Sequence, residues 1–585
     1  MANGRPPGEG SSRSSRRHRR KVANADGLAA LDTQMRGGAP PGAVANEKGL
    51  ALLGEKVRQS ETSRSRRRRR VKRGALIGVA ALILLAGGGA GYLYYLTHDL
   101  NRVNVKGLNS GFDAGAEQGT ENILMVGSTS RCALAQQSLA YGLCSEGVNA
   151  VNSDVIMILH ADPQHHRLAL LSIPRDLFIP NARSEGANKI DAGLYEGVAQ
   201  VVAAIEEDFG IPIQHTVTLN FDQFANVVNA LGGINMSFPL SVFDDESGLN
   251  VQAATCVHLN GTQALQVVRA RHLQYRSATT ASSDAFYWPE ETLSDLARIR
   301  RDHEFLRVLA TAVGKHGLGN PLSDIDLINS VKADLTFDQS WSVNDMADLV
   351  LDFHSINVNS VPQLTLPVAV VTDPDGSGGT LMYKGAPYGD SEFPAQSQDQ
   401  SAIDQVLGIS ATTDSMTGQT LPGPSTVTVS VMNGTGAANQ ATATASALAA
   451  LGFHTVGVGD TNPVGDVAET YVFYGSRAPA TEAAAEAVVR SMSGAVIMAY
   501  EPSQVTDGAQ VTVDTGTQFA VDAPPTSATG STTGSSAPSS PVTTTTSPSS
   551  TAIAAPSPTT QNLQPWDPRA CPAGAVPTAP VPNHT

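Results

Sequence analysis

Cysteine and aromatic residues are scarce in this sequence. Four cysteines occur among 585 residues, and Phe, Trp and Tyr together make up 5%. Four cysteines are too few for a disulfide-dense scaffold, and their spacing fits neither a zinc motif nor a Cys-x-x-Cys redox pair. The common hydrolase signals, Gly-x-Ser-x-Gly and His-Glu-x-x-His, are absent, as are a Walker A loop and a Ser-x-x-Lys motif in a fitting context.

Charged residues are also few, at 16% of the chain, whereas hydrophobic residues make up 41%. This composition excludes a wholly disordered protein, and the length predicts more than one domain. The net charge of −15 hides a division. Residues 1–73 contain 19 basic and 6 acidic residues, which leaves 20 basic and 48 acidic residues for the rest. The chain therefore has a basic start and an acidic remainder.

One uncharged apolar stretch, residues 74–96, separates these two parts. It is long enough to cross a bilayer once as a helix. The basic cluster at 66–73 precedes it, so the positive-inside rule predicts a cytoplasmic N-terminus and a plasma-membrane protein whose remaining chain lies outside. A buried core helix and a cleaved signal peptide are the alternatives. The dense basic flank and the length of the apolar stretch favour an uncleaved transmembrane anchor.

The basic tail at 1–73 is rich in Gly, Ser and Arg and is predicted to be disordered. Its charge alone is compatible with nucleic-acid binding. We favour a role in orienting the protein and binding anionic lipid, and expect no nucleic acid as a partner.

Five segments are expected outside the membrane. Residues 97–118 form a stalk, and residues 119–400 form the main domain. A linker at 401–424 leads to a small domain at 425–501. The Pro-, Ser- and Thr-rich remainder, 502–585, is predicted to be a disordered tail.

Hydrophobic spacing predicts the fold of both domains. In the main domain, strands are expected at 123–126, 155–160, 167–173 and 216–221, and helices at 194–209, 221–231 and 292–313. In the small domain, strands are expected at 426–432, 455–458, 470–473 and 496–500, and helices at 437–451 and 480–492. We therefore expect an α/β or α+β fold, in which helices flank a mixed β-sheet, followed by a small αβ sandwich.

A disulfide is permitted outside the cytoplasm. Cys132 and Cys144 would close a short loop, and we expect them to pair. The pairing of Cys256 and Cys571 is left open.

Arginines and one aspartate form the candidate site. Asp154 begins the second strand and Arg175 follows the third. Arg269 and Arg271 share one side if 267–271 is extended, and Arg298 lies on the third helix. Guanidinium groups hold phosphate oxygens in a bidentate manner, and a carboxylate at a strand end can hold Mg²⁺ together with substrate phosphates. This set would suit a pyrophosphate.

A salt-bridged, solvated surface is the competing interpretation. Seven arginines fall within residues 269–307: Arg269, Arg271, Arg276, Arg298, Arg300, Arg301 and Arg307. Six acidic residues in the same window could neutralise them: Asp284, Glu290, Glu291, Asp295, Asp302 and Glu304. Spacing alone favours this interpretation. His165 and His166 follow a turn and are expected at the surface.

Five ordered motifs carry a resemblance to a known family. They are NILMVGSTSR at 122–131, NSD at 152–154, IPRD at 173–176, LNGTQAL at 259–265 followed by RAR at 269–271, and SDLARIRR at 294–301. They resemble the LytR-CpsA-Psr family of cell-wall glycopolymer ligases over about 119–350. Residues 425–501 resemble the LytR C-terminal domain that often follows in actinobacterial members.

The resemblance implies a phosphotransferase that moves a glycopolymer from a polyprenyl-pyrophosphate carrier to peptidoglycan outside the membrane; arabinogalactan is the preferred polymer. It implies that the lipid tail occupies an apolar tunnel in the core. Roles in substrate binding and catalysis are implied for six residues: Arg131, Asp154, Arg175, Arg269, Arg271 and Arg298. Asp154 would bind Mg²⁺, with Thr129 at the second metal position.

Two residues depart from the family pattern. Thr129 stands where an aspartate is usual, and Asp302 where a glutamine is usual. A threonine hydroxyl is a weaker, neutral ligand, and Asp302 would either supply a carboxylate or repel phosphate. Longer segments at 132–150 and 272–293 could cover the site. The alternatives to an enzyme are a scaffold that binds the lipid-linked polymer and a membrane-bound regulator.

Overall fold

The structure is a computed structural model, and the residues that it describes all lie after Tyr92. These residues are 100–108, 119–128, 151–292, 294–316, 335–353, 355–370, 380–461, 464, 469–523 and 563–585. No helix within these ranges is long and apolar enough to cross a bilayer. The span expected at 74–96 lies outside them and stays a prediction, as do the basic tail and the pairing of Cys132 with Cys144.

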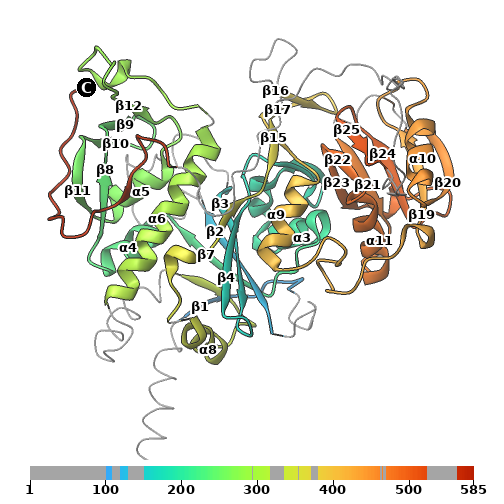
Figure 1. Ribbon diagram of the computed structural model, residues 1–585, viewed down its shortest axis with the longest axis horizontal. Coiled ribbons are helices and arrows are strands. Elements are labelled where there is room, and N and C mark those ends of the chain that lie inside the picture. The colour runs from blue at the N-terminus through green and yellow to red at the C-terminus, as the bar shows by residue number, and fades with distance from the viewer. Residues whose placement is uncertain are drawn as a thin grey trace, which may run out of the picture. The chain divides into compact units, whose positions relative to one another are not determined.

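A seven-stranded mixed sheet forms the centre of the main domain (Figure 1). Its strands, in spatial order, are β1 (Asn101–Val103), β13 (Thr336–Asp338), β7 (His215–Asn220), β2 (Glu121–Ser128), β3 (Ser153–Asp162), β4 (Arg167–Ser172) and β14 (Gln363–Thr365). β2 pairs antiparallel with β3 and parallel with β7. The expected mixed sheet is confirmed.

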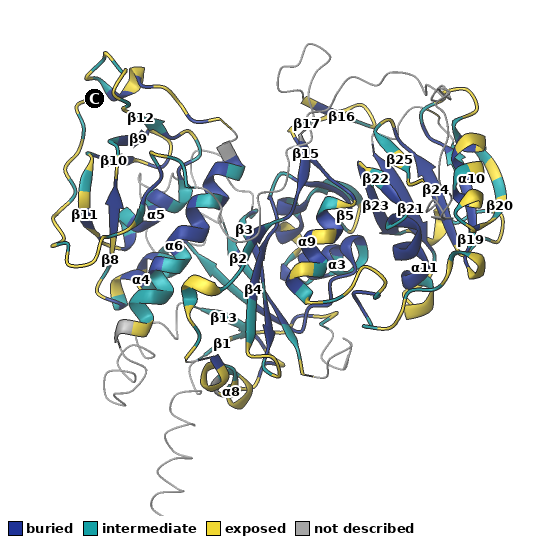
Figure 2. Cartoon of the chain, in the orientation of Figure 1, coloured by how far each residue is buried: buried dark blue, intermediate teal, exposed yellow. Residues whose placement is uncertain are grey.

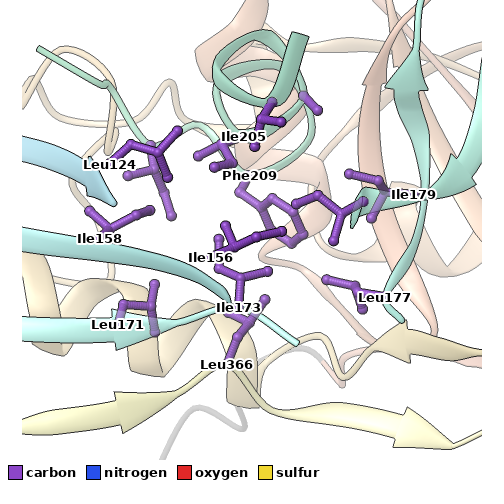
Figure 3. Packing of buried hydrophobic residues seen from close by; sticks show 14 of the residues in the cluster. Leu124, Ile156, Ile158, Leu171, Ile173, Leu177, Ile179, Ile205, Phe209 and Leu366 are labelled. Atoms are coloured by element: carbon purple, nitrogen blue, oxygen red, sulfur yellow. The ribbon is translucent and has the colours of Figure 1, made fainter. Parts of the chain in front are cut away.

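Side chains alternate between the two faces of this sheet, as the pleat of a strand requires. On one face Leu124, Ile156 and Ile158 are buried against α3 (Val198–Phe209) and α9 (Gln398–Leu407). Figure 3 shows these side chains packed against Ile205 and Phe209 of α3. This face is a close-packed core that holds the sheet rigid.

Three helices cover the other face: α4 (Phe221–Ala230), α5 (Gly261–Arg269) and α6 (Ser294–His316) (Figure 1). Both α4 and α5 begin with a capping box, formed by Asn220 with Gln223 and by Asn260 with Gln263. A Cβ atom at Gly261 would lie 2.0 Å from the carbonyl oxygen of Ala225, so only glycine allows α5 to approach α4 this closely.

Smaller elements surround this core. Beside α4–α6 lie β8 (Ile234–Phe238), β9 (Val242–Asp244), β10 (Leu249–Val251), β11 (Ala254–Leu259), β12 (Gln274–Tyr275) and β26 (Arg569–Ala570). Elsewhere lie β5 (Phe178–Arg183), β6 (Gly186–Lys189), the 3₁₀ helix η2 (Ile190–Glu196), α8 (Val343–Phe353), β15 (Val368–Val370), β16 (Thr380–Tyr383), β17 (Ala386–Asp390) and β18 (Glu392–Pro394).

The small domain is a five-stranded mixed sheet with two helices. Its strands, in order, are β20 (His454–Asp460), β19 (Thr428–Asn433), β24 (Val511–Thr515), β21 (Thr470–Tyr474) and β23 (Val496–Tyr500), and its helices are α10 (Gln440–Ala450) and α11 (Pro479–Val489). Figure 2 shows β21, β23 and β24 buried along their length. β22 (Met492–Gly494) and β25 (Phe519–Val521) form a separate pair.

Several expected boundaries are wrong. The stalk contains β1, which pairs with β13 at the edge of the main sheet. The linker contains most of α9, from residue 401 onward, whose Ile403 and Val406 are buried in the main core. The tail contains β24, a central strand of the small domain, and its last residues, 563–585, pack on the main domain. Segments rich in Ser, Thr, Gly and Pro thus take part in both cores.

The pairing of Cys256 with Cys571, which the sequence left open, is a disulfide that spans 315 residues of chain. Cys256 lies on β11, and Cys571 directly follows β26. Because β26 pairs antiparallel with β8, this bond fixes the C-terminal segment to the same layer of the main domain.

Buried carboxyl groups make the stability of this fold depend on pH. Burial raises the pKa of several of them: to about 6 for Asp191, about 7 for Asp399 and Asp514, and about 8 for Glu206, Asp302, Glu392, Glu482 and Glu486. Groups with a raised pKa in the folded state stabilise the fold while they are protonated. That contribution is lost as the pH rises through the folded pKa.

We therefore predict that the thermal unfolding midpoint falls between pH 6 and pH 9, as followed by circular dichroism. Glu482→Gln, a neutral substitute for a protonated carboxyl, should flatten this fall, whereas Glu185→Gln at an exposed position should not. A midpoint that rises or stays constant over this range would contradict the prediction.

Candidate active site

Neighbouring strands bring Asp154 and Arg175 together. β3 and β4 are antiparallel, with Met157 opposite Ser172, so the start of β3 lies beside the end of β4. Arg175 follows β4 and donates from Nη1 to Oδ1 of Asp154 at 2.5 Å. Its Nε donates to Asp176 at 3.3 Å. The third motif of the sequence thus folds back onto the second.

Asp295 on α6 connects three arginines. Its Oδ1 lies 3.0 Å from Nη2 of Arg298, and 3.5 Å from Nε of both Arg175 and Arg271. Arg298 also donates from Nη2 to the backbone carbonyl of Asp154 at 2.6 Å. Only 3% of the Arg298 side chain is exposed. A buried carboxylate therefore gathers guanidinium groups from three separate parts of the chain.

A cavity of about 320 Å³ lies between the main sheet and helices α4–α6. Its charged lining residues are Asp154, Arg269, Arg298 and Asp302. Most of the others are apolar: Met125, Val155, Met157, Val217, Leu219, Phe221, Phe224, Val227, Val228, Leu265, Val268, Phe305, Leu306, Leu309 and Leu335. The strand residues among them, Met125, Val155, Met157, Val217 and Leu219, belong to the face of the sheet opposite the close-packed core.

The charge is concentrated at one end of this cavity. Along α6 the lining residues are Arg298 and Asp302, then Phe305, Leu306 and Leu309. At a rise of 1.5 Å per residue, Arg298 and Leu309 are separated by roughly 16 Å. The cavity therefore has a charged end near the start of α6 and an apolar length beyond it.

The two carboxyl groups of the cavity differ in charge. Burial alone would raise the pKa of Asp154, but Arg298 and Arg175 outweigh it and the pKa is lowered. Burial also dominates at Asp302, where Arg298 and Arg301 oppose it only in part, and the pKa rises to about 8. Neither side-chain oxygen of Asp302 accepts a hydrogen bond from another described residue. Asp154 is thus ionised at pH 7, whereas Asp302 is mainly neutral.

The structure brings together four of the expected residues, Asp154, Arg175, Arg271 and Arg298, in this ion-pair network. Arg269 lies at the cavity, with its guanidinium 4.7 Å from the centre of the Phe221 ring. Residues 267–271 do not meet the condition of an extended conformation under which Arg269 and Arg271 would share one side, because Arg269 is the last residue of α5. Thr129 and Arg131 lie outside the described ranges.

The salt-bridge interpretation holds for the other arginines of α6. Arg300 and Arg301 pair with Glu291 and with Asp567 from the C-terminal segment. Arg307 pairs with Glu304. The arginine-rich window thus divides into a group at the cavity and a group that stabilises the back of α6. His165 and His166 are exposed, as expected.

Two site residues were not predicted. Lys189 donates a hydrogen bond from Nζ to Asp176 at 2.9 Å. The carboxylate of Asp191 accepts a hydrogen bond from Asn152, and burial raises the pKa of Asp191. Lys189 is the last residue of β6 and Asp191 lies in η2, and no motif in the sequence connects them to Arg175. Asp295 lies three residues before Arg298 on α6, a spacing that places the two side chains on one face of the helix.

Asp154 provides a partial fit to a magnesium site. No group of three or more His, Cys, Asp or Glu side chains within the described ranges is arranged to hold a metal ion. Mg²⁺ commonly binds one or two carboxylates, with water and substrate phosphates as its other ligands. The ionised Asp154 fits that pattern when a substrate supplies further oxygens.

Comparison with known sequences assigns the family. The LytR_cpsA_psr family matches residues 97–388, a longer stretch than the motifs indicated. The chain belongs to the LytR-CpsA-Psr family. Residues 426–519 match a second family, LytR cell envelope-related transcriptional attenuator. That match includes β24, in agreement with the boundary seen in the structure.

Curated relatives share the main domain. The probable cell wall biosynthesis protein LcpB of Corynebacterium glutamicum is 30% identical over 256 residues, which are 43% of this chain and only 56% of LcpB. Cell wall biosynthesis protein LcpA of the same organism is 26% identical over 79% of this chain and 90% of LcpA. The polyisoprenyl-teichoic acid–peptidoglycan teichoic acid transferase TagU of Bacillus cereus is 24% identical over 46% of this chain and 80% of TagU.

The position of Asp295 predicts a large effect of its removal. Asp295→Asn should lower the free energy of unfolding by about 3 kcal/mol, because breaking a buried ion pair leaves uncompensated charge. Asp245→Asn, at an exposed position, should change it by no more than about 0.5 kcal/mol. Urea denaturation measures both, and equal stability of the two variants would contradict the arrangement described here.

Proposed function

We propose that this protein transfers a glycopolymer from a polyprenyl-pyrophosphate carrier to peptidoglycan. The observation that carries the proposal is the cavity, whose apolar length suits a prenyl chain and whose charged end contains Arg269 and the buried Arg298. Membership of the LytR-CpsA-Psr family supports it, as does similarity to a relative named as a teichoic acid transferase. Within this class we favour arabinogalactan as the polymer.

The arginines would bind the diphosphate. Arg298 and Arg271 each have a buried Nε that makes no hydrogen bond to a described residue, although each lies near a carboxylate. Guanidinium groups with unused donors suit phosphate oxygens. On binding, phosphate would compete with Asp295 and Asp154 for the same cations. The carboxylates would thus hold the arginines in place between turnovers.

The proposed reaction is a phosphoryl transfer. The hydroxyl oxygen of a muramic acid unit attacks the phosphorus that carries the glycopolymer, and a new P–O bond forms. The bond from that phosphorus to the bridging oxygen breaks, and polyprenyl phosphate leaves with the electron pair. The proton of the attacking hydroxyl passes to water. Arg175, Arg269, Arg271 and Arg298 would stabilise the negative charge that develops on the phosphate oxygens.

Asp154 and Thr129 would hold Mg²⁺, which would neutralise charge on the diphosphate. The segment 74–96 would anchor the protein in the plasma membrane, with its N-terminus in the cytoplasm and the cavity outside.

Arg175 provides the first test. Arg175→Ala in the full-length protein should lower kcat for polyprenyl phosphate release by about 10²–10³-fold, the usual loss for one charge-stabilising donor. Arg183→Ala, which removes an arginine that pairs with Glu196 away from the network, is the matched control. Full activity of Arg175→Ala would contradict the assignment. A wild-type protein that binds the lipid tightly but releases no polyprenyl phosphate would instead identify a scaffold.

Asp302 predicts a pH dependence. Because its pKa is about 8, higher pH places a negative charge in the cavity beside the anionic substrate. The value of kcat/KM should therefore fall as the pH rises from 7 to 9. Asp302→Asn should remove most of that fall, and a pH profile identical to that of the wild type would refute the prediction.

A further inference from the structure

The C-terminal segment, residues 563–585, is bound to the main domain by several independent contacts. β26 pairs with β8, and the disulfide from Cys571 to Cys256 follows directly. Trp566 stacks on Tyr275, with the ring centres 4.0 Å apart. In Figure 1 this segment runs beside β8, β11 and α6.

Asp567 of this segment enters a buried ion cluster behind α6. Its carboxylate is fully buried and accepts from Nε of Arg300 at 2.6 Å and from Nη2 at 3.2 Å. It also lies 3.8 Å from Arg301, whose Nη1 pairs with Glu291. Trp566 donates from its indole nitrogen to Glu291 at 3.1 Å. The cluster thus contains two guanidinium groups and two carboxylates.

Arg301 connects this cluster to the candidate active site. Its second arm, Nη2, donates to the backbone carbonyl of Ala270. Ala270 is the single residue between Arg269, which lines the cavity, and Arg271, which pairs with Asp176 and Asp295. The position of this carbonyl therefore fixes the backbone from which the side chains of both arginines extend.

The charge balance of the cluster determines whether Arg301 can make that contact. Without the Asp567 carboxylate, Glu291 alone would face the half-buried guanidinium of Arg300 and the buried guanidinium of Arg301. A buried charge without a partner is strongly unfavourable, so Arg300 and Arg301 would compete for Glu291. Arg301 would then rotate away from Ala270 or admit water beside it.

We propose that Asp567 is a positioning residue for the active site: by neutralising Arg300, it allows Arg301 to hold the Ala270 carbonyl and so fixes Arg269 and Arg271. The end of the chain, beyond the small domain and a Ser-, Thr- and Pro-rich stretch, thus completes the main domain. This inference rests on the proposed function, because it gives Arg269 and Arg271 a common task.

The test uses the full-length protein and two measurements. One is the Kd for geranylgeranyl pyrophosphate, and the other is KM and kcat for prenyl phosphate release from a geranylgeranyl-pyrophosphate-linked disaccharide. Asp567→Asn should raise Kd and KM about tenfold and change kcat by less than threefold, because binding geometry is affected more than the chemical step. Asn583→Ala, which removes a hydrogen bond of the same segment to Val242, should leave Kd and KM unchanged.

A double variant separates positioning from general loss of stability. In Asp567→Asn with Arg300→Gln, Glu291 again faces a single guanidinium, so Kd and KM should return to within about twofold of the wild-type values. If Asp567→Asn does not fold, Arg301→Lys is the substitute, because it keeps the charge but removes the second donor arm. Its Kd should rise about tenfold.

Unchanged binding in Asp567→Asn, or a loss that the double variant does not restore, would overturn the inference. Unchanged binding in Arg301→Lys would do the same if that variant is the one tested. A wild-type protein that neither binds the pyrophosphate nor releases prenyl phosphate would instead overturn the proposed function. The two failures are therefore distinguishable.

Discussion

The neutralisation of buried arginines by aspartates is the constraint on which this site depends. Arg298 is almost fully buried, and a lone guanidinium in such a place would be strongly destabilising. Asp295 and Asp154 remove that penalty, and they also determine where the guanidinium groups point. The same ion pairs that make the fold possible therefore arrange several cations at one end of an apolar cavity. Stability and substrate binding use the same side chains here.

The two faces of the main sheet have different tasks, stability on one face and substrate binding on the other. One face is packed against α3 and α9 in a buried hydrophobic core, whereas the other supports the cavity under α4–α6. α6 has a similar division around its circumference. Arg298 and Asp302 face the cavity, while Arg300 and Arg301 pair with Glu291 and the C-terminal segment. The ion pairs of Arg300 and Arg301 thus hold α6 on the side away from the cavity, while Arg298 and Asp302 place charged groups at the cavity.

Local patterns in the sequence predicted four strands of the central sheet (β2, β3, β4 and β7) and the helices α3, α4 and α6, because each has a clear apolar period. They missed α5, although Asn260 and Gln263 form a capping box that marks its start. They also missed β24, a short strand in a segment whose composition resembles a linker. Composition is a weak guide where a short strand is buried between neighbours.

For the site, the ordered motifs identified Asp154 and four arginines, but not how they are connected. The contacts of Asp295 with Arg175 and Arg271 join segments about 24 to 120 residues apart, and the disulfide at Cys571 spans 315. Pairings of this kind depend on the folded topology and leave no periodic signal in a single sequence.

A structure of the protein with a prenyl pyrophosphate tests the central claim most directly. The account predicts the diphosphate between Arg269, Arg271 and Arg298 with the prenyl chain between α4 and α6. A diphosphate bound elsewhere, with this cavity empty, would contradict it.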